Sequence, residues 1–417
     1  MSEFAGIATV AGVLVAYGLV SRRLATTPVS GPMIFVAAGV LLGPSALDVV
    51  DVRVESGALR TVAEATLVLV LYTDAIRVDL RRMRDQAQLP VRLLGVGLPL
   101  TIAAGAGTAA ILFTDLDVWE AALVAAVLSP TDAALGQAVV TSERVPARVR
   151  QAINVESGLN DGLMVPVVTV LLALAGAGMS LAGPASWAGF AGHQIGLGLL
   201  VGAATGLAGG WVLDRAVGAG WVDGAFRQLA TLGIGVGAFA VAELAGGNGF
   251  VAAFVAGIGF ATAARDHCEH AHDFSEDEAH LLAMLTFLFF GAAMVGPYLD
   301  DLDWRIGIYA VLSLTAIRMV PVALALARSG LRLPTIGFIA WFGPRGIASV
   351  LFVLFVIEEA ALPGAETIIA TVSWTVLLSV VAHGATAYPF AERYGRWIER
   401  SETPREDEDV AIMPIRR

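Results

Sequence analysis

Residues 155–162 read Val-Glu-Ser-Gly-Leu-Asn-Asp-Gly and interrupt an otherwise apolar stretch at about 152–177. An apolar stretch of that length can cross roughly 30 Å of hydrocarbon as a helix. Each charged group in the middle of such a span costs about 2.5–3.5 kcal/mol even on the lenient insertion scale, so it persists only where it faces another charge, water or an ion. Glu156 and Asp161 are therefore candidate functional residues, and a buried structural ion-pair network is the alternative.

The polar side chains of this stretch share one broad face of the expected helix. Glu156 and Asn160 are four residues apart, and so are Ser157 and Asp161, which is the spacing of neighbours on a helix surface. The face offers mainly oxygen ligands, which hard cations prefer, so we expect a weakly held Na⁺ or a related ion attracted by Asp161. Burial in general raises the pKa of a carboxyl group, so a proton and a cation can compete for one such group. That competition is a mechanism of exchange.

The composition of the whole chain is that of a membrane protein. Of its 417 residues 57% are hydrophobic, and only 15% are charged, against about 25% in an ordinary soluble domain. The mean hydropathy is +0.74. Every basic residue is Arg, and the net charge is -11, so no polybasic segment for nucleic acid is present. A single cysteine, Cys268, excludes a disulfide framework. A soluble enzyme, a nucleic-acid binder and a disordered chain all fit poorly.

Apolar stretches near 20 residues recur along the chain and predict an all-α polytopic membrane protein with about 13 transmembrane helices. Most of the arginines lie in the loops that follow odd-numbered spans and in the tail, whereas the opposite loops are acidic. Because cytoplasmic loops carry the excess of positive charge, this pattern predicts that the C-terminus lies in the cytoplasm. The protein itself is expected in the cell membrane. The expected spans lie roughly at 4–21, 30–47, 59–76, 93–113, 118–141, 152–177, 189–213, 227–245, 248–264, 281–299, 305–327, 334–357 and 367–391.

Two other spans are interrupted by proline. In span five, Pro130 removes a backbone donor within Ser-Pro-Thr-Asp at 129–132, and irregular backbone in mid-membrane is tolerated only where it lines a cavity or is covered by protein. Freed carbonyls and Asp132 can complete an ion site opposite Asp161. The alternative is an ordinary proline kink, with Asp132 capping the half-helix that follows it.

Span twelve contains the second interruption, Trp-Phe-Gly-Pro-Arg-Gly at 341–346. Interrupted helices at matching positions in two halves point to the binding site of a transporter. The layout therefore predicts two inverted repeats, at about 1–177 and 227–391, linked by a helix at 189–213. Together they form a transmembrane domain at 1–391, and 392–417 are expected to be a short, flexible cytoplasmic tail.

Two arginines fall inside spans. Arg318 needs a partner, because a guanidinium group does not deprotonate in proteins. Glu156 is the expected partner, which leaves Asp161 as the main group that exchanges its proton. Arg345 is expected to cover the exposed carbonyl ends within span twelve.

Taken together, these motifs resemble the monovalent cation/proton antiporter-1 family, the largely electroneutral sodium/proton exchangers. The resemblance rests on the run at 156–161, the break at Thr131 and Asp132, Arg318, and Gly-Pro-Arg-Gly at 343–346, and it extends over all the expected spans. It implies a fold of inverted repeats with two crossing unwound helices. It also implies a homodimer in which a core domain moves against a dimer-forming domain.

The resemblance also implies the cation ligands. The ion would be held by three side chains and by the main-chain carbonyl of Thr131, with Glu156 close by and paired to Arg318; the side chains are those of Asp161, Asp132 and Ser157. The family often places Pro directly after the Asp of the span-five break, whereas here Ala133 follows Asp132 and Pro130 precedes it. The unwound stretch is therefore expected to lie differently along the span.

The stoichiometry follows from the residue before Asp161. In electrogenic relatives that position is a second Asp, whereas here it is Asn160. One titrating carboxylate carries one proton or one monovalent ion, so we expect one-for-one exchange without net charge movement. Arg318 supports this expectation, because a Lys in its place could carry a proton and an Arg cannot.

The expected function is thus a secondary antiporter that exchanges Na⁺, or Li⁺, for H⁺ and takes part in pH homeostasis. It is expected to be a transporter and not an enzyme, without a cofactor, with the monovalent cation, the proton and the lipid bilayer as its partners. Three alternatives stay open: a K⁺/H⁺ exchanger on the same fold, a cation channel with the same acidic pathway, and a membrane sensor that transports nothing.

Weaker signals have more than one interpretation. Asp74 either attracts cations to an entry funnel or pairs with Arg77. A glycine face in span seven serves tight packing within the chain or, less favoured, a dimer seam; it consists of Gly198, Gly202, Gly206 and Gly210. The His-rich acidic loop 266–280 is expected to be solvated, with a pH sensor or a metal site as alternatives. His383 is expected near a span end, in a solvated or locally bonded role.

Overall fold

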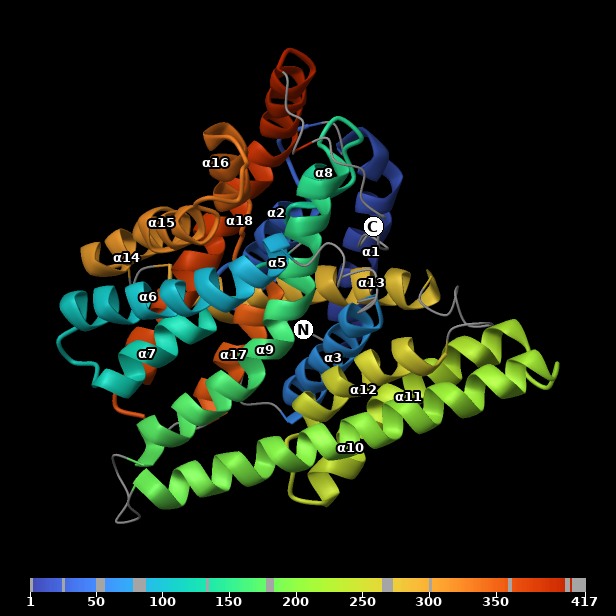
Figure 1. Ribbon diagram of the computed structural model, residues 1–417. Helices are drawn as coiled ribbons and strands as arrows, with labels where there is room; N and C mark the ends of the chain where they lie inside the picture. The colour runs from blue at the N-terminus through green and yellow to red at the C-terminus, as the bar shows by residue number, and fades with distance from the viewer. Residues whose placement is uncertain are drawn as a thin grey trace.

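The computed structural model describes residues 3–24, 27–49, 57–77, 88–132, 135–177, 184–264, 273–299, 302–358, 362–401 and 406. Within these ranges the regular structure is entirely helical (Figure 1). Two short segments, η1 and η2, are π-helical continuations of α5 and α13. The helices are α1 (Glu3–Leu24), α2 (Gly31–Leu42), α3 (Gly57–Ile76), α5 (Gln88–Arg92), η1 (Leu93–Gly97), α6 (Leu98–Leu112), α7 (Val118–Val127), α8 (Gln137–Val140), α9 (Ala147–Ala177), α10 (Pro184–Gly218), α11 (Gly224–Leu244), α12 (Gly249–Ala263), α13 (Asp273–Phe290), η2 (Gly291–Val295), α14 (Trp304–Leu314), α15 (Ala316–Ala325), α16 (Leu333–Trp341), α17 (Ile347–Glu358) and α18 (Ala365–Glu399).

Each of the spans expected from the sequence coincides with one helix or with an interrupted series of helices. In the described part of the chain, seven helices are long and apolar enough to cross a membrane, and shorter apolar helices accompany them. The expected polytopic, all-helical fold is therefore confirmed, and the chain is a multi-pass membrane protein. The long ones are Phe4–Leu24, Gln88–Leu112, Ala147–Gly176, Gly192–Gly218, Gly224–Leu244, Trp304–Ala325 and Ala365–Glu399.

Short polar residues set several helix starts. Asp117 begins α7, where its carboxylate accepts hydrogen bonds from the backbone N–H groups of Trp119 and Glu120 at 2.7 and 2.8 Å. Asn248 begins α12 in the same way, and its side-chain oxygen accepts from the N–H of Val251 at 2.9 Å. Such caps satisfy donors that have no partner within the helix. The cap at Asn248 makes spans eight and nine two separate helices.

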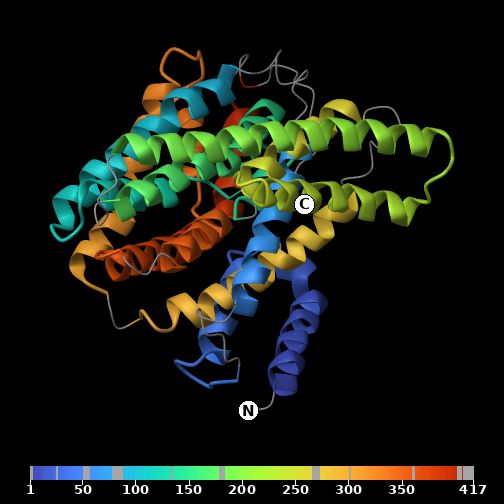
Figure 2. The same ribbon diagram turned by 90° about the horizontal axis from the view of Figure 1, so that it is seen from below.

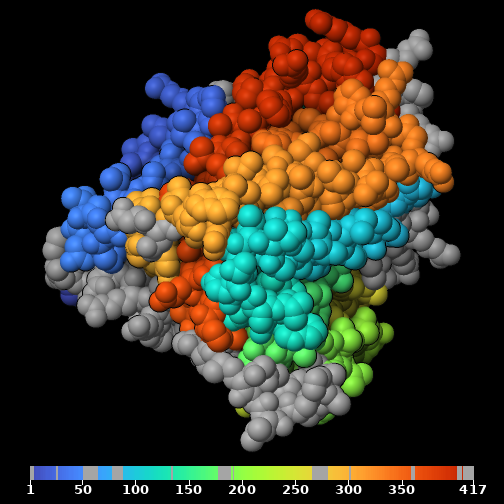
Figure 3. Space-filling model, turned by 90° about the vertical axis from the view of Figure 1, so that its left-hand side faces the viewer, coloured from blue at the N-terminus to red at the C-terminus, as the bar shows by residue number. Residues whose placement is uncertain are grey.

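The helices pack into two groups. The continuous-helix bundle consists of α1, α2, α3, α10, α11, α12 and α13, whereas the interrupted-helix bundle consists of α5 to α9 and α14 to α18. Figure 2 shows α10 and α11 side by side, projecting away from α14 and α15. Figure 3 shows the side of the interrupted-helix bundle where α6 (cyan) meets α14 and α15 (orange). Helix α9, which carries Glu156 and Asp161, contacts helices of both bundles.

The glycine face of span seven packs within the chain. Three glycines of α10 lie against backbone atoms of α12 and its N-cap residue, so closely that a Cβ on any of them would collide. The pairs are Gly198 with Asn248, Gly202 with Ala252 and Gly206 with Ala256. Gly210 of α10 lies close to Phe260 of α12. Small residues allow such close approach of two helices. The expected packing role is confirmed, and these glycines face α12 in preference to a dimer seam.

The C-terminal helix differs from its expected end. Helix α18 continues past residue 391 to Glu399, because this segment packs onto the neighbouring interrupted helices. Tyr394 stacks on Phe338 of α16 with ring centroids 4.1 Å apart, and its hydroxyl donates to Thr335 Oγ1 at 3.0 Å. Glu406 is also buried and accepts hydrogen bonds from the N–H of Arg332 and from Thr335 at the start of α16. Residues 402–405 and 407–417 of the expected tail lie outside the described residues.

Candidate functional site

The breaks in spans five and twelve meet inside the interrupted-helix bundle. The N–H of Asp132, after the end of α7, donates to the carbonyl of Pro344 between α16 and α17 at 2.8 Å. In return, Asp132 Oδ2 accepts from the N–H of Ile347, the first residue of α17, at 3.0 Å. These two hydrogen bonds join segments more than 200 residues apart in sequence. The two crossing unwound helices expected from the family resemblance are present.

Asp132 and Arg345 each cap a helix end on the opposite break. Asp132 caps the N-terminus of α17, on the opposite break. Residues 133 and 134, which follow it in span five, lie outside the described residues, so the alternative of a cap on its own half-helix stays untested. Arg345 is fully buried, and its Nη1 donates to the carbonyls of Ser129 and Pro130 at 2.8 and 3.4 Å. The expectation that it covers carbonyls of its own span is wrong, because the crossing brings the carbonyl end of α7 within reach of its side chain.

The two glycines of the span-twelve motif make room for these charged side chains. A Cβ at Gly343 would collide with the guanidinium group of Arg318, and a Cβ at Gly346 would collide with the carboxylate of Asp132. The break therefore fits between two charged groups only because both positions lack a side chain.

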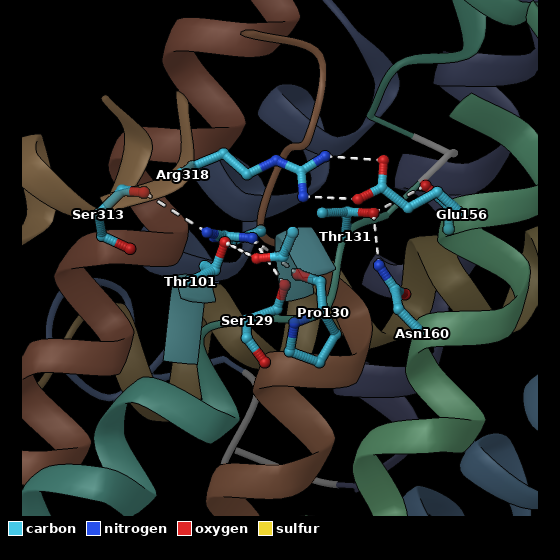
Figure 4. A network of polar contacts seen from close by, with 11 residues as sticks. Thr101, Ser129, Pro130, Thr131, Glu156, Asn160, Ser313 and Arg318 are labelled. Carbon is cyan, nitrogen blue, oxygen red and sulfur yellow. Dashed lines mark hydrogen bonds and ion pairs between the residues drawn. The ribbon is translucent and has the colours of Figure 1, made fainter. Parts of the chain in front are cut away.

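Glu156 and Arg318 form the ion pair that the sequence predicts (Figure 4). Arg318 Nη1 and Nη2 donate to the two carboxylate oxygens of Glu156 at 2.6 and 2.8 Å, and each residue is 1% exposed. Span eleven is interrupted at Thr315, so Arg318 lies in the first turn of α15. A bidentate contact of this kind is the strong form of an Arg–carboxylate pair.

The polar face of α9 contacts the break in span five through Thr131. Its hydroxyl lies 2.9 Å from Ser157 Oγ. It also accepts from Asn160 Nδ2 at 2.8 Å (Figure 4). All three residues are buried. The contact brings the backbone at Thr131 and Asp132 to the oxygen-bearing face that the sequence predicts as the cation site.

Asp161 lies in α9 one turn after Ser157 and is 4% exposed, as is Asp132. Both carboxylates are thus buried in the interrupted-helix bundle beside the contact of Thr131 with α9. Ala133, the departure from the family pattern, lies outside the described residues. The roles of these residues as cation ligands stay predictions.

Asp74 has the partner that one of its two interpretations predicts. Its Oδ1 lies 3.5 Å from Arg77 Nη1, and both side chains are buried. Asp74 also lies beside Gly158 of α9, where a Cβ would approach its Cβ and carbonyl oxygen to 3.9 Å. The His-rich loop is different: its residues 266–272 lie outside the described residues.

Sequence reasoning missed two residues of α18 that hold the span-twelve break. His383 and Ser379 are both buried and contact Trp341 and Arg345. The expected local bond of His383 is present, because its Nδ1 contacts Ser379 four residues earlier on α18. The histidine is buried and not solvated, it also contacts Trp341, and it lies well inside the helix because α18 extends to Glu399. An ionisable residue within an apolar span was the available signal.

Fold and site together are those of a helical membrane protein whose candidate binding site lies at two crossed, interrupted helices. The family model described as sodium/hydrogen exchanger, transmembrane, matches residues 9–393. The chain belongs to this family. Among solved structures, it resembles the sodium proton antiporter MjNhaP1 from Methanocaldococcus jannaschii, with a TM-score of 0.76 and 19% identity over 95% of this chain and 100% of that one. At 19% identity, this similarity shows that the two chains share a fold.

Two named relatives are similar in sequence. The K(+)/H(+) antiporter NhaP2 of Shewanella oneidensis is 26% identical over 85% of this chain and 61% of its own length. The Na(+)/H(+) antiporter NhaG of Bacillus atrophaeus is 27% identical over 67% of this chain and 54% of its own length. The chain thus spans between half and two thirds of the length of these relatives.

Proposed function

We propose that this protein exchanges Na⁺, or Li⁺, for H⁺ across the cell membrane, one for one, by competition of the cation and the proton for Asp161. The observation that carries the proposal is the contact of the span-five break with the polar face of α9. Thr131 meets Ser157 and Asn160 there, one turn from Asp161. Hydroxyl, carbonyl and carboxylate oxygens around a buried acid suit a monovalent hard cation.

The site residues have two proposed roles: some are cation ligands, and others hold those ligands in place. Glu156 is committed to Arg318 by two short hydrogen bonds, so its charge is balanced and Asp161 is the acid that changes occupant. Asn160 and Arg345 hold the break in place through Thr131 and Ser129. The proposed ligands are Asp161, Asp132, Ser157 and the main-chain carbonyl of Thr131, with Glu156 close by.

A K⁺/H⁺ exchanger on the same fold is the second candidate. A relative in Shewanella oneidensis carries the name K(+)/H(+) antiporter, and one in Bacillus atrophaeus carries the name Na(+)/H(+) antiporter. Oxygen ligands serve both ions, so ion choice depends on cavity size and ligand rigidity. The two candidates share every residue role given above.

The remaining architecture is proposed as follows. The chain forms two inverted repeats, 1–177 and 227–391, linked by 189–213, with a cytoplasmic C-terminus. The two bundles support this division, because each contains helices from both halves of the chain. We also propose a homodimer in which the interrupted-helix bundle moves against the continuous-helix bundle. Such a motion would alternately open a site at the crossed breaks to the two sides of the membrane.

Purified protein in liposomes tests the exchange directly. With a pH-sensitive dye inside the vesicles, adding Na⁺, Li⁺ or K⁺ outside is expected to raise the internal pH as protons leave. Asp161→Asn is expected to abolish the signal while the protein still elutes as a folded species. A signal equal to wild type from Asp161→Asn would reject the proposed role of this residue.

Two further measurements separate the alternatives. A channel would carry the cation without coupled proton movement, and a sensor would give no flux of either ion. An imposed membrane potential is expected to leave the exchange rate unchanged, because one charge moves in each direction. A strong dependence of the rate on the potential would reject one-for-one stoichiometry.

A further inference from the structure

A buried histidine on α18 lies against the carbonyl end of α16. His383 Nε2 lies 2.9 Å from the carbonyl oxygen of Trp341, the last residue of that helix. Since a carbonyl oxygen only accepts hydrogen bonds, Nε2 carries a proton and donates it to Trp341. The imidazole ring also stacks on the indole of Trp341, with ring centroids 4.9 Å apart and an interplanar angle of 29°.

Ser379, one turn before His383, holds the other end of the same break. Its hydroxyl oxygen accepts from the N–H of Arg345 at 2.7 Å. Nδ1 of His383 lies 3.2 Å from this hydroxyl and 3.1 Å from the carbonyl of Ser379. A continuous series of contacts therefore runs from Trp341 through His383 and Ser379 to Arg345. All of it is buried except the partly exposed Trp341.

These contacts give side-chain partners to backbone groups at the crossing; the carbonyl of Trp341 accepts from His383 in addition to the N–H of Gly343. The ends of an interrupted helix leave backbone groups without partners, and in mid-membrane no bulk water replaces them. Arg345 serves the carbonyl end of α7, and Asp132 serves the N–H end of α17. His383 does for the carbonyl end of α16 what Arg345 does for α7.

The position of the break matters for the proposed cation site because Asp132 is attached to it. Asp132 donates to the carbonyl of Pro344 and accepts from the N–H of Ile347. A displacement of residues 342–346 therefore displaces the carboxylate of Asp132.

We infer that His383 and Ser379 are positioning residues for cation binding: they fasten the span-twelve break to α18 and thereby set the place of the Asp132 carboxylate. The inference rests on the proposed function. Because these residues act on a cation ligand and not on the folding of α18, their loss raises the cation KM far more than it lowers the maximal rate.

The test compares four variants in liposomes with proton movement as the readout. His383→Leu removes the donor to Trp341, and Ser379→Ala removes the acceptor for Arg345. His383→Gln keeps an N–H donor at the same reach and is the conservative rescue. Thr375→Val is the matched control, because Thr375 is equally buried on α18 and its side-chain hydrogen bond within the described residues stays in its own helix, to the carbonyl of Thr371 at 2.7 Å.

The expected result is a rise of about tenfold or more in the cation KM for His383→Leu and for Ser379→Ala. A tenfold rise in KM corresponds to a tenfold loss of affinity where the cation dissociates faster than it is transported. His383→Gln is expected to recover most of the affinity, and Thr375→Val to match wild type. A KM equal to that of Thr375→Val in both loss variants would overturn the inference. So would a fall in maximal rate and thermal stability with an unchanged KM.

A second readout covers variants that do not reconstitute. In detergent, the rise of the thermal unfolding midpoint with cation concentration reports binding without transport, and the loss variants are expected to need higher concentrations for the same rise. If wild-type protein exchanges cations and the loss variants keep the wild-type concentration dependence, only the positioning role fails. If wild-type protein neither exchanges cations nor is stabilised by them, the proposed function fails and the inference falls with it.

Discussion

Gly346 lies against Asp132 so closely that a Cβ at the glycine would collide with the carboxylate. The same carboxylate accepts from the N–H of Ile347, the residue after Gly346. The crossing of the two breaks therefore depends on a backbone that passes directly over a proposed cation ligand.

Gly346→Ala is accordingly expected to raise the cation KM by about tenfold or more, equivalent to about 1.4 kcal/mol of binding free energy. The reason is that the added methyl group must displace either Asp132 or the break. Gly337→Ala is the matched control in the neighbouring half-helix, where an added Cβ meets no atom within 4 Å. Proton movement in liposomes at varied cation concentration measures both, and equal KM values for the two variants would contradict the prediction.

The Glu156–Arg318 pair is expected to affect the stability of the protein because it is buried, and not because its hydrogen bonds are short. Arg318→Leu leaves an unpaired buried carboxylate and is expected to destabilise the protein by about 3–5 kcal/mol. Glu156→Leu combined with Arg318→Leu is expected to be more stable than the single variant. Thermal unfolding in detergent checks the order of the midpoints.

A more exposed ion pair with the same shortest distance offers a contrast. Arg144 and Glu392 are also 2.6 Å apart, but their side chains are 50% and 27% exposed. Arg144→Leu is therefore expected to cost less than about 1 kcal/mol. Equal losses of stability for Arg144→Leu and Arg318→Leu would show that burial of the inner pair has no special effect.

The close packing of α10 on α12 predicts a stability difference between two glycines. Gly206→Val would drive a side chain into the backbone at Ala256 and is expected to cost about 1–3 kcal/mol through overpacking. Gly196→Val adds the same side chain on the same helix, where a Cβ meets nothing within 4 Å. A lower thermal midpoint for Gly206→Val alone supports the packing, and two equal midpoints would oppose it.

The start of α16 depends on the C-terminal segment. Glu406 accepts from the N–H of Arg332 and from Thr335 Oγ1 at 2.9 and 3.0 Å, so Glu406→Ala is expected to cost about 1 kcal/mol, as does the loss of other helix caps. Glu399→Ala, at the exposed end of α18, is the control. Thermal unfolding distinguishes them, and identical midpoints would mean that the contact contributes nothing to stability.

Much of the fold could be predicted because the bilayer imposes a simple rule on sequence. A span needs about 20 apolar residues, so each expected range contains a helix. The ion pair of Glu156 with Arg318 followed from the same reasoning, since a buried guanidinium needs a carboxylate and few were available inside spans.

What could not be predicted depends on which chain segments cross in space. The partner of Arg345 is a carbonyl at Ser129, more than 200 residues away, and no spacing in the sequence indicates it. The burial of His383 was missed for a related reason. The end of α18 is set by the contact of Tyr394 with α16, and a hydropathy pattern contains no information on that contact.

The central claim is that a cation and a proton occupy Asp161 in turn, and its most direct test is the pH dependence of the cation KM in liposomes. Competition predicts that the KM rises steadily as the pH falls while the maximal rate at saturating cation stays constant. It also predicts that Asp161→Asn abolishes exchange at every pH. A KM that is independent of pH, or exchange that persists in Asp161→Asn, would contradict the account.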